Sequence, residues 1–535
     1  MRPKFSNDST GLVIPAQVVI GVTGHRNITE SPELSRGINS AIEEIRRTAP
    51  SLRSTPLILN VLSPLAEGAD RLVAREVLKD PESVLEVVLP LAIDEYVKDF
   101  ETGESRKEFE ELLSQARNVR ILPSRGSRNQ AYQQLGLYVV DQCDALIALW
   151  DGKPAAGQGG TAEIVEYARK HNCLLIWINP EAPEHIAVEP GQGIDPRPFQ
   201  DLDGYNSEPV NDTEVESQLK RQSDFFTVEA ERSRLPADIL RPTFEYILGH
   251  YVRADILALR FQHLYYRCET AVYILALLAI AVAASQFLFL PDKPIILVSE
   301  VILMIAVLAI FGMSRHRQWH TRWIDYRFLA ERIRSALFMA VVNIDVATLR
   351  PPRHLSLSYS SNDWMVDAFS SFWNQRPSMQ KAGSSLFDGL KDFICEAWIE
   401  DQIRYHDSTS KRHYRRHHRM TRVSYTLLGL TVCAAIIHIV DIGSQTLQSV
   451  LVFMAIILPT AALFISAIRT HRDYLRNSMR SSEMVNHLTE LKDRMIMAQD
   501  HDTFLRLVRE TEETMLHENE DWRVVVRFNI PEVPA

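Results

Sequence analysis

Four long apolar stretches dominate the second half of the chain. Each is about 20 residues long, which is the length that an α-helix needs to cross a hydrocarbon core of about 30 Å. A short connection joins the members of each pair, so the pattern predicts two membrane-spanning hairpins and leaves four buried helices of a large soluble bundle as the alternative. The stretches are Thr270–Leu290, Ile295–Met313, Val423–Ile442 and Val450–Ile468.

The first half alternates between short apolar runs rich in Val, Ile and Leu and longer helical stretches. Continuous apolar strands joined by helices are typical of a parallel sheet covered on both faces. The chain therefore predicts a Rossmann-like α/β domain followed by an all-α membrane domain of two duplicated hairpins with long cytosolic helices. The expected strands are Val18–Val22, Leu57–Leu62, Leu85–Leu89, Val119–Leu122, Ala145–Trp150 and Leu174–Ile178. The expected helices are Glu33–Arg47, Asp70–Leu78, Asp94–Ala116, Gln130–Gln142 and Thr161–Lys170.

Glycines and small polar residues gather after three of the predicted strands, where parallel sheets bind their ligands. Loop 21–26 reads GVTGHR, loop 63–71 reads SPLAEGADR, and Asp151-Gly152-Lys153 is followed by GQGGTAE at 157–163. Glycines let backbone amides approach an anion, and two of the loops open a helix whose dipole favours phosphate. Arg26 adds a bidentate donor for phosphate. Each loop alone also suits an ordinary strand-to-helix turn, with Thr161 or Asp70 as a helix cap.

The motifs TGHR, EGAD, CDALIALWDG and GQGGTAEIV resemble the SLOG superfamily, which includes LOG phosphoribohydrolases and DprA-type proteins. The resemblance covers about residues 17–180. It implies a Rossmann-like domain that binds or processes nucleotides or NAD-related ligands. Carried over residue by residue, it implies phosphate or ribose contacts from Gly159, Gly160 and Thr161. It places Gly24, His25, Gly68 and Asp70 along the same cleft.

One departure from that pattern bears on catalysis. LOG-type hydrolases and the similar nucleoside deoxyribosyltransferases carry their catalytic Glu three residues after Thr, where this chain has Ile164. The nearest acids are Glu163 and Glu166, and a shift of one position rotates a side chain by about 100° around a helix. Two hypotheses follow: a domain that only binds its ligand, or an N-glycosidase that uses Glu163 as its catalytic residue.

The helical half contains an internal sequence repeat (a sequence echo) at a spacing of about 155 residues, with His316-Arg317 matching His471-Arg472. These repeats resemble SLATT, a two-transmembrane effector domain that accompanies SLOG sensors in bacterial conflict systems. The segments ADILALRFQHLYYR and WIDYRFLAERIR of the first repeat carry the closest resemblance. It implies pore formation or membrane disruption once a nucleotide signal is sensed. The predicted domains are 1–180 (SLOG-like), 181–235 (Pro-rich acidic linker), 236–345 and 396–535 (SLATT-like units), with 346–395 as a cytosolic connection.

Charge is distributed unevenly between the two halves. Residues 1–250 carry 26 Lys and Arg against 39 Asp and Glu, whereas residues 251–535 carry 32 against 29, within a net charge of −10. An acidic head argues against nucleic-acid binding. Cations flank the apolar stretches on the sides away from the hairpin tips, so the positive-inside rule predicts both termini in the cytoplasm. The resemblance to SLATT implies that the membrane is the bacterial inner membrane.

The five cysteines show no metal-ligand spacing, so no metal site is expected. No resident cofactor is expected either, only a nucleotide or NAD-derived ligand. The expected partners are a nucleotide-like small molecule, the lipid bilayer and further copies of the same chain. The leading hypothesis is a membrane effector gated by a nucleotide or NAD-derived signal. The alternatives are the membrane-tethered N-glycosidase and a lipid or ion transporter. A transporter is disfavoured because few ionisable groups lie within the apolar stretches.

Overall fold

A computed structural model describes residues 12–123, 126–154, 159–344, 364–377, 386–441 and 443–528. The chain divides into two compact units. The first comprises Met1–Pro209 with Ala347–Arg376, and the second comprises Val210–Val346 with Pro377–Ala535. The first unit is the predicted α/β domain and the second is all-helical, so the predicted fold class is confirmed.

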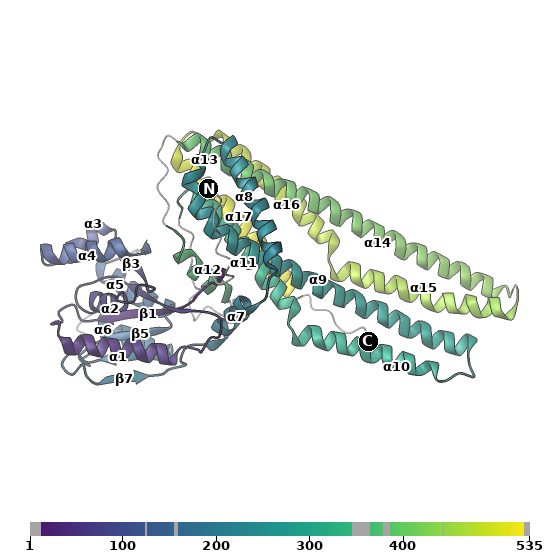
Figure 1. Ribbon diagram of the computed structural model, residues 1–535, viewed down its shortest axis with the longest axis horizontal. Helices are drawn as coiled ribbons and strands as arrows, with labels where there is room; N and C mark the ends of the chain where they lie inside the picture. The colour runs from purple at the N-terminus through teal and green to yellow at the C-terminus, as the bar shows by residue number, and fades with distance from the viewer. Residues whose placement is uncertain are drawn as a thin grey trace. The chain divides into compact units, whose positions relative to one another are not determined.

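A seven-stranded sheet forms the centre of the first unit, with strand order β4-β3-β2-β1-β5-β6-β7 (Figure 1). All neighbouring strands are parallel except β7, which runs antiparallel to β6. Each of the six predicted strands is present. The strands are β1 (Ala16–Gly24), β2 (Leu57–Ser63), β3 (Val84–Leu89), β4 (Asn118–Ile121), β5 (Ala145–Leu149), β6 (Leu174–Ile178) and β7 (Ile186–Glu189).

Helices cover both faces of this sheet. Val18, Val19 and Ile20 of β1 are all buried, although successive side chains of a strand point to opposite faces. Helices α5 (Arg128–Gln142) and α6 (Thr161–Lys170) pack on the face that contains Val19. The helices α1 (Pro32–Thr48) and α2 (Ala69–Val77) contact each other and the sheet.

The helix predicted over Asp94–Ala116 is broken into three pieces. These are α3 (Ile93–Tyr96), the short 3-10 turn η2 (Val97–Asp99) and α4 (Gly103–Gln115). Thr102 explains the restart, because its extended backbone and its side chain, which accepts a hydrogen bond from the Ser105 amide, make it a helix N-cap.

The segment predicted as a linker, residues 181–235, is folded instead. It contains β7, α7 (Pro196–Ser207) and α8 (Asp212–Arg232). Its prolines misled the sequence prediction, because Pro196 occupies the first turn of α7, where a missing amide hydrogen costs nothing. Asn211 then caps α8 by accepting a hydrogen bond from the Thr213 amide.

The first unit is completed by a helix from much later in the sequence. In the predicted connection 346–395, residues 346–363 and 378–385 lie outside the described residues, and α12 (Trp364–Asn374) lies between them. This helix packs against β1 and α7. Ser371 Oγ donates to the Pro15 carbonyl (2.5 Å) and Asn374 Nδ2 donates to Glu86 Oε1 (2.6 Å). A fragment that ends before α12 therefore leaves part of this core uncovered.

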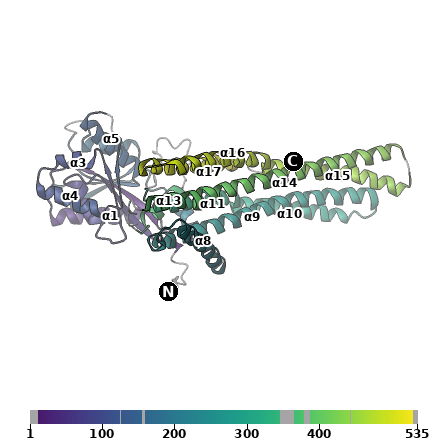
Figure 2. The ribbon, with the colours of Figure 1, turned by 90° about the horizontal axis from the view of Figure 1, so that it is seen from above.

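The second unit consists of long helices. Four of its helical segments are long and apolar enough to cross a membrane, and they contain the four predicted apolar stretches to within three residues at each end of a stretch. Within these segments, α9 runs beside α10 and α14 beside α15, as Figure 2 shows, and α9 also contacts α15. The helices are α9 (Ala237–Phe289), α10 (Ile296–His316), α11 (Trp319–Val341), α13 (Phe387–Phe393), α14 (Asp401–Ile439), α15 (Gln445–His471), α16 (Tyr474–Met497) and α17 (His501–Phe528).

The backbone repeats the duplication seen in the sequence. In each copy a long first helix turns at a hairpin tip, a second helix returns, and a third helix packs against the first. The break between second and third helix is a single left-handed residue, Gln318 (φ 51°) in one copy and Asp473 (φ 45°) in the other. These residues are 155 positions apart, the spacing of the sequence echo. A non-glycine residue with positive φ is uncommon, so its recurrence at corresponding joints supports two copies of one helix–hairpin–helix unit.

Candidate functional site

The predicted site lies at the switch point of the sheet. After β1 the chain adds β2, β3 and β4 on one side of this strand, and β5 and β6 on the other side. The loops that follow β1 and β5 therefore leave the sheet next to each other, which is where open α/β sheets form a ligand crevice. The structure brings together the loops that carry Gly24, Gly68 and Asp151.

His25 joins these three loops. Its amide donates to the Leu149 carbonyl (3.1 Å), and its carbonyl accepts from the Ala69 amide (3.1 Å). Its ring Nε2 lies 2.9 Å from Asp151 Oδ1. Lys153 Nζ contacts the other oxygen of Asp151 (2.8 Å). The hydrogen bonds from Lys153 and His25 lower the pKa of Asp151, which keeps this carboxylate charged.

Gly68 allows the loop after β2 to approach the loop after β1. Its φ is +78°, and a Cβ atom built on it would lie 2.2 Å from the Arg26 carbonyl oxygen and 2.5 Å from that of His25. Only glycine fits this combination of backbone angle and close approach. Gly68 is also the N-cap of α2, and no side chain caps this helix start. Gly24 is similarly crowded, because an added Cβ would lie 2.3 Å from Cβ of Ala69.

Asp70 lies in the first turn of α2 but does not cap it. It is buried, and its Oδ2 accepts a hydrogen bond from the Ala66 amide (3.1 Å), which orders the loop after β2. Burial raises the pKa of Asp70 to about 7, although that amide and the charges of Arg26 and Arg71 act in the opposite direction. The neighbouring Glu67 is turned away toward α4, where it accepts hydrogen bonds from Ser105 and from the Glu101 amide.

We expect Asp70 to make the stability of the first unit depend on pH. The folded state keeps the proton up to about pH 7, whereas an unfolded aspartic acid releases it near its ordinary pKa of 3.8. The stabilisation is therefore complete below that ordinary pKa and is lost as the pH rises through 7, by at most about 4 kcal/mol. Thermal unfolding of the full chain at pH 5 and pH 8 measures about 3 kcal/mol of this loss, because pH 5 already lies above the ordinary pKa of 3.8. Asp70→Asn should lack it, and an unchanged pH dependence in that variant would refute the assignment.

Arg26 is exposed in the loop that follows β1. Its guanidinium lies 5.0 Å from the centre of the Tyr132 ring of α5, which holds it by a cation–π contact. Tyr132 in turn donates to Asp99, and Arg128 forms an ion pair with the same carboxylate (2.6 Å). The sequence analysis missed Tyr132, because an aromatic residue on a crossover helix carries no motif.

The glycine turn before α6 already holds a carboxylate. The Gly159 amide donates to Glu163 Oε2 (2.8 Å), and Gln133 Nε2 of α5 donates to the other oxygen. Gly159 has φ +81°, Gly160 is the N-cap without a side-chain cap, and Thr161 begins the helix. Gly157 and Gln158 lie outside the described residues. The Gly159 amide is therefore occupied by a carboxylate of the protein itself, that of Glu163.

The position of the LOG-type catalytic residue points into the core. Ile164 is buried with α5 and β5, and an added Cβ on Gly136 would lie 2.4 Å from it. Glu166, the other acid nearby, is exposed on α6. Glu163, the remaining acid beside the turn, accepts hydrogen bonds from Gln133 and from the Gly159 amide. Among the described residues, no group of His, Cys, Asp or Glu side chains is arranged to hold a metal ion.

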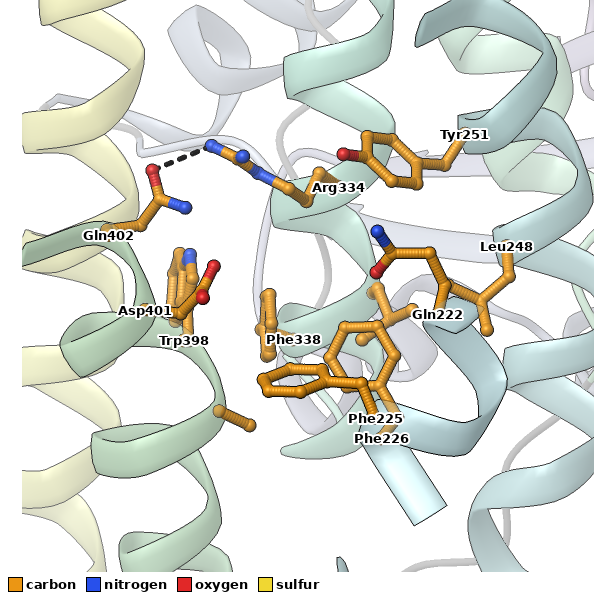
Figure 3. Close-up of a pocket in the computed structure, with 12 residues that line it drawn as sticks. Gln222, Phe225, Phe226, Leu248, Tyr251, Arg334, Phe338, Trp398, Asp401 and Gln402 are labelled. Carbon is orange, nitrogen blue, oxygen red and sulfur yellow. Dashed lines mark hydrogen bonds between the residues drawn. The ribbon is translucent and has the colours of Figure 1, made fainter. Parts of the chain in front are cut away.

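The second unit contains a small cavity where its two copies meet. Figure 3 shows Arg334 of α11 reaching Gln402 of α14, with a hydrogen bond of 2.8 Å. Phe338 stacks on Trp398 of the π-helical segment η5 (Ile394–Glu400) at 4.9 Å. The cavity measures about 50 Å³ and is also lined by α8 and α9. Sites for drug-sized ligands measure about 300–1,000 Å³, so this cavity suits a few waters rather than a nucleotide.

Residues 395–522 match the family described as "SMODS and SLOG-associating 2TM effector domain 1" (SLATT_1). The matched region begins within η5, includes α14, α15 and α16, and ends in α17. The second copy thus contains a SLATT domain. The match falls on this copy rather than on the first, where the resemblance was expected to be closer. A search of curated proteins finds no match to this chain.

The family match and the four long apolar helices together indicate a membrane effector domain. Four segments able to span a bilayer, two of them within the matched region, agree with its two-transmembrane description. The N-terminal α/β sheet is present, but no comparison assigns it to a family, so its SLOG-like character remains a prediction.

Proposed function

We propose that this protein is a membrane effector in bacterial anti-phage defence whose first unit senses a nucleotide or NAD-derived signal. Ligand binding would gate pore formation or membrane disruption by an oligomer of the helical unit in the inner membrane, with both termini in the cytoplasm. The observation that carries the sensing role is the convergence of three loops on His25, at the switch point of a parallel sheet. That edge offers Arg26, backbone amides and a glycine-rich turn to a phosphorylated ligand.

Each predicted site residue has a place in this proposal. Gly24 and Gly68 permit the close approach of the loops, and Asp70 orders one of them from its buried position. Arg26 pairs with the phosphate. The ring of His25, held by Asp151, faces the ribose or base. On the other side of the crevice, Gly159, Gly160 and Thr161 offer amides and a hydroxyl, and Glu163 either yields the Gly159 amide to the ligand or accepts from a ribose hydroxyl.

Calorimetric titration of the full chain, in neutral detergent, with a panel of nucleotides and NAD derivatives tests the sensing role. Arg26→Gln should weaken binding by about tenfold or more, since a charge-assisted contact contributes about 1.5–3 kcal/mol. Arg36→Gln, on the exposed surface of α1, is the matched control. No binding by any member of the panel would refute the sensing role.

The rival function, an N-glycosidase, makes a different prediction in the same samples. Release of free base from a bound nucleotide or NAD would show catalysis. Glu163→Gln would then abolish that release. If the domain only binds its ligand, Glu163→Gln should have a small effect. The side-chain carbonyl oxygen of the new Gln can still accept one of the hydrogen bonds from Gln133 and Gly159, so the affinity for the ligand should change by less than about tenfold.

A further inference from the structure

We propose that the end of α14 preceding the third span is a binding surface for the headgroups of anionic phospholipids. Residues 411–422 read KRHYRRHHRMTR, with six Lys or Arg and neither Asp nor Glu. All six cations are exposed on the helix surface. The proposal is independent of the nucleotide-sensing role, because it concerns only the helical unit.

Five of the six cations of this surface have no carboxylate partner in the part of the chain that the structure describes. Lys411 pairs with Asp407 (2.7 Å). The contacts of Arg412, Arg415 and Arg422 are with a hydroxyl or with carbonyls of the same helix, and in the described part of the chain none of the five arginines is within 4 Å of a carboxylate. Five exposed guanidinium groups without a nearby carboxylate repel one another, and an anion bound from outside the protein lowers this repulsion.

Packing of α14 leaves this charge facing outward. Its inward stripe contains small and uncharged groups: Ser410 bonds to Ser478 of α16, and Ser424 lies against Ala462 of α15. The neighbouring end of α15 adds another cation, Arg469, which donates to Thr421 (2.6 Å). Arg472, which follows α15, is in contrast already paired, with Glu269 of α9 in the first copy (3.1 Å).

The position along the helix selects lipid as the partner. The apolar stretch begins at Val423, and Tyr425, with 71% of its surface exposed, marks the interfacial layer that tyrosine favours. At 1.5 Å per residue, Arg415 lies about 10 Å from Arg422. The headgroup layer is about 5–8 Å thick and anionic charge acts over a further Debye length of about 8–10 Å. Arg415, Arg416, Arg419 and Arg422 therefore lie within reach of headgroup phosphates, and clusters of this kind beside a span bind anionic lipids.

The test uses the full chain in neutral detergent, titrated with short-chain phosphatidylglycerol and, separately, with short-chain phosphatidylcholine. Phosphatidylglycerol should bind about tenfold tighter or more, and that preference should fall between 50 and 300 mM salt. Replacing Arg415, Arg416, Arg419 and Arg422 together by Gln should abolish the preference. Replacing the same four by Lys should retain it, which separates charge from folding. The matched control neutralises four exposed cations elsewhere in the helical unit: Lys220, Arg221, Arg506 and Arg509.

Several outcomes would overturn the proposal. If the two lipids bound equally well, this surface would have no preference for anionic lipid. If the control variant lost the preference for phosphatidylglycerol as completely as the four-arginine variant, the preference would not depend on this surface. Displacement of phosphatidylglycerol by inorganic phosphate at the same concentration would indicate a site for free phosphate. Displacement by an RNA oligonucleotide at a lower concentration than the lipid would indicate a nucleic-acid surface instead.

Discussion

Glu331→Ala is expected to lower the free energy of unfolding of the helical unit by about 3–5 kcal/mol. Glu331 of α11 is buried, with 5% of its side chain exposed, and it pairs with both Arg327 and Arg334. Arg327 also pairs with Asp255 of α9 (2.9 Å), and Arg334 reaches Gln402 of α14. Removal of the shared carboxylate leaves two largely buried guanidinium groups, with 23% and 19% of their side chains exposed, without enough counter-charge. Breaking a buried ion pair from one side in this way is strongly destabilising.

Thermal unfolding in detergent checks this result, with a drop in Tm of about 5 °C or more. Glu483→Ala removes an exposed carboxylate from α16 and should change Tm little. Replacing Glu331, Arg327 and Arg334 by Met together with Asp255 by Asn should recover much of the loss, because no charged group of this network is then left without a partner. A Tm drop for Glu331→Ala no larger than the control's would show that this network stabilises nothing.

Gly68→Ala is expected to disrupt the candidate site and, with it, ligand binding by about tenfold or more. The new Cβ would fall on the carbonyl oxygens of His25 and Arg26, and the residue would keep a φ of +78° that side chains rarely adopt. Separation of the two loops moves Arg26 away from the crevice. The strain itself should destabilise the first unit by about 1–3 kcal/mol.

Gly103→Ala provides the matched control, because an added Cβ there meets nothing within 4 Å at the start of α4. Its Tm and its affinity for the nucleotide found in the panel should stay near those of the natural chain. If Gly68→Ala lowered Tm but bound that nucleotide normally, the ligand site would lie elsewhere in the protein.

The pattern of hydrophobic residues was enough to predict the architecture. Continuous apolar strands and 20-residue apolar helices leave few alternatives, so the six parallel strands and the four spanning segments were placed correctly. Errors arose where the local signal was ambiguous. Prolines at 180–198 were interpreted as a tether, although Pro196 starts a helix. The aromatic helix α12 was missed, because its role depends on a core formed by residues more than 150 positions earlier.

The site shows what a sequence motif leaves undetermined. The motifs located the loops that the sheet brings together, since strand ends follow from strand order. They did not reveal that Glu163 turns back to the Gly159 amide, or that Tyr132 and Gln133 of α5 hold Arg26 and Glu163. Those contacts depend on how α5 lies against α6, which periodicity alone does not specify.

Dye release from liposomes that contain the full chain is the most direct test of the central claim. That claim is that a ligand bound to the first unit makes the helical unit disrupt the bilayer. Liposomes with the natural protein should stay sealed alone and leak once the nucleotide or NAD derivative that binds is added, whereas Arg26→Gln should require about tenfold more ligand. Leakage of equal rate with and without every ligand of the panel, or no leakage under any condition, would contradict this account.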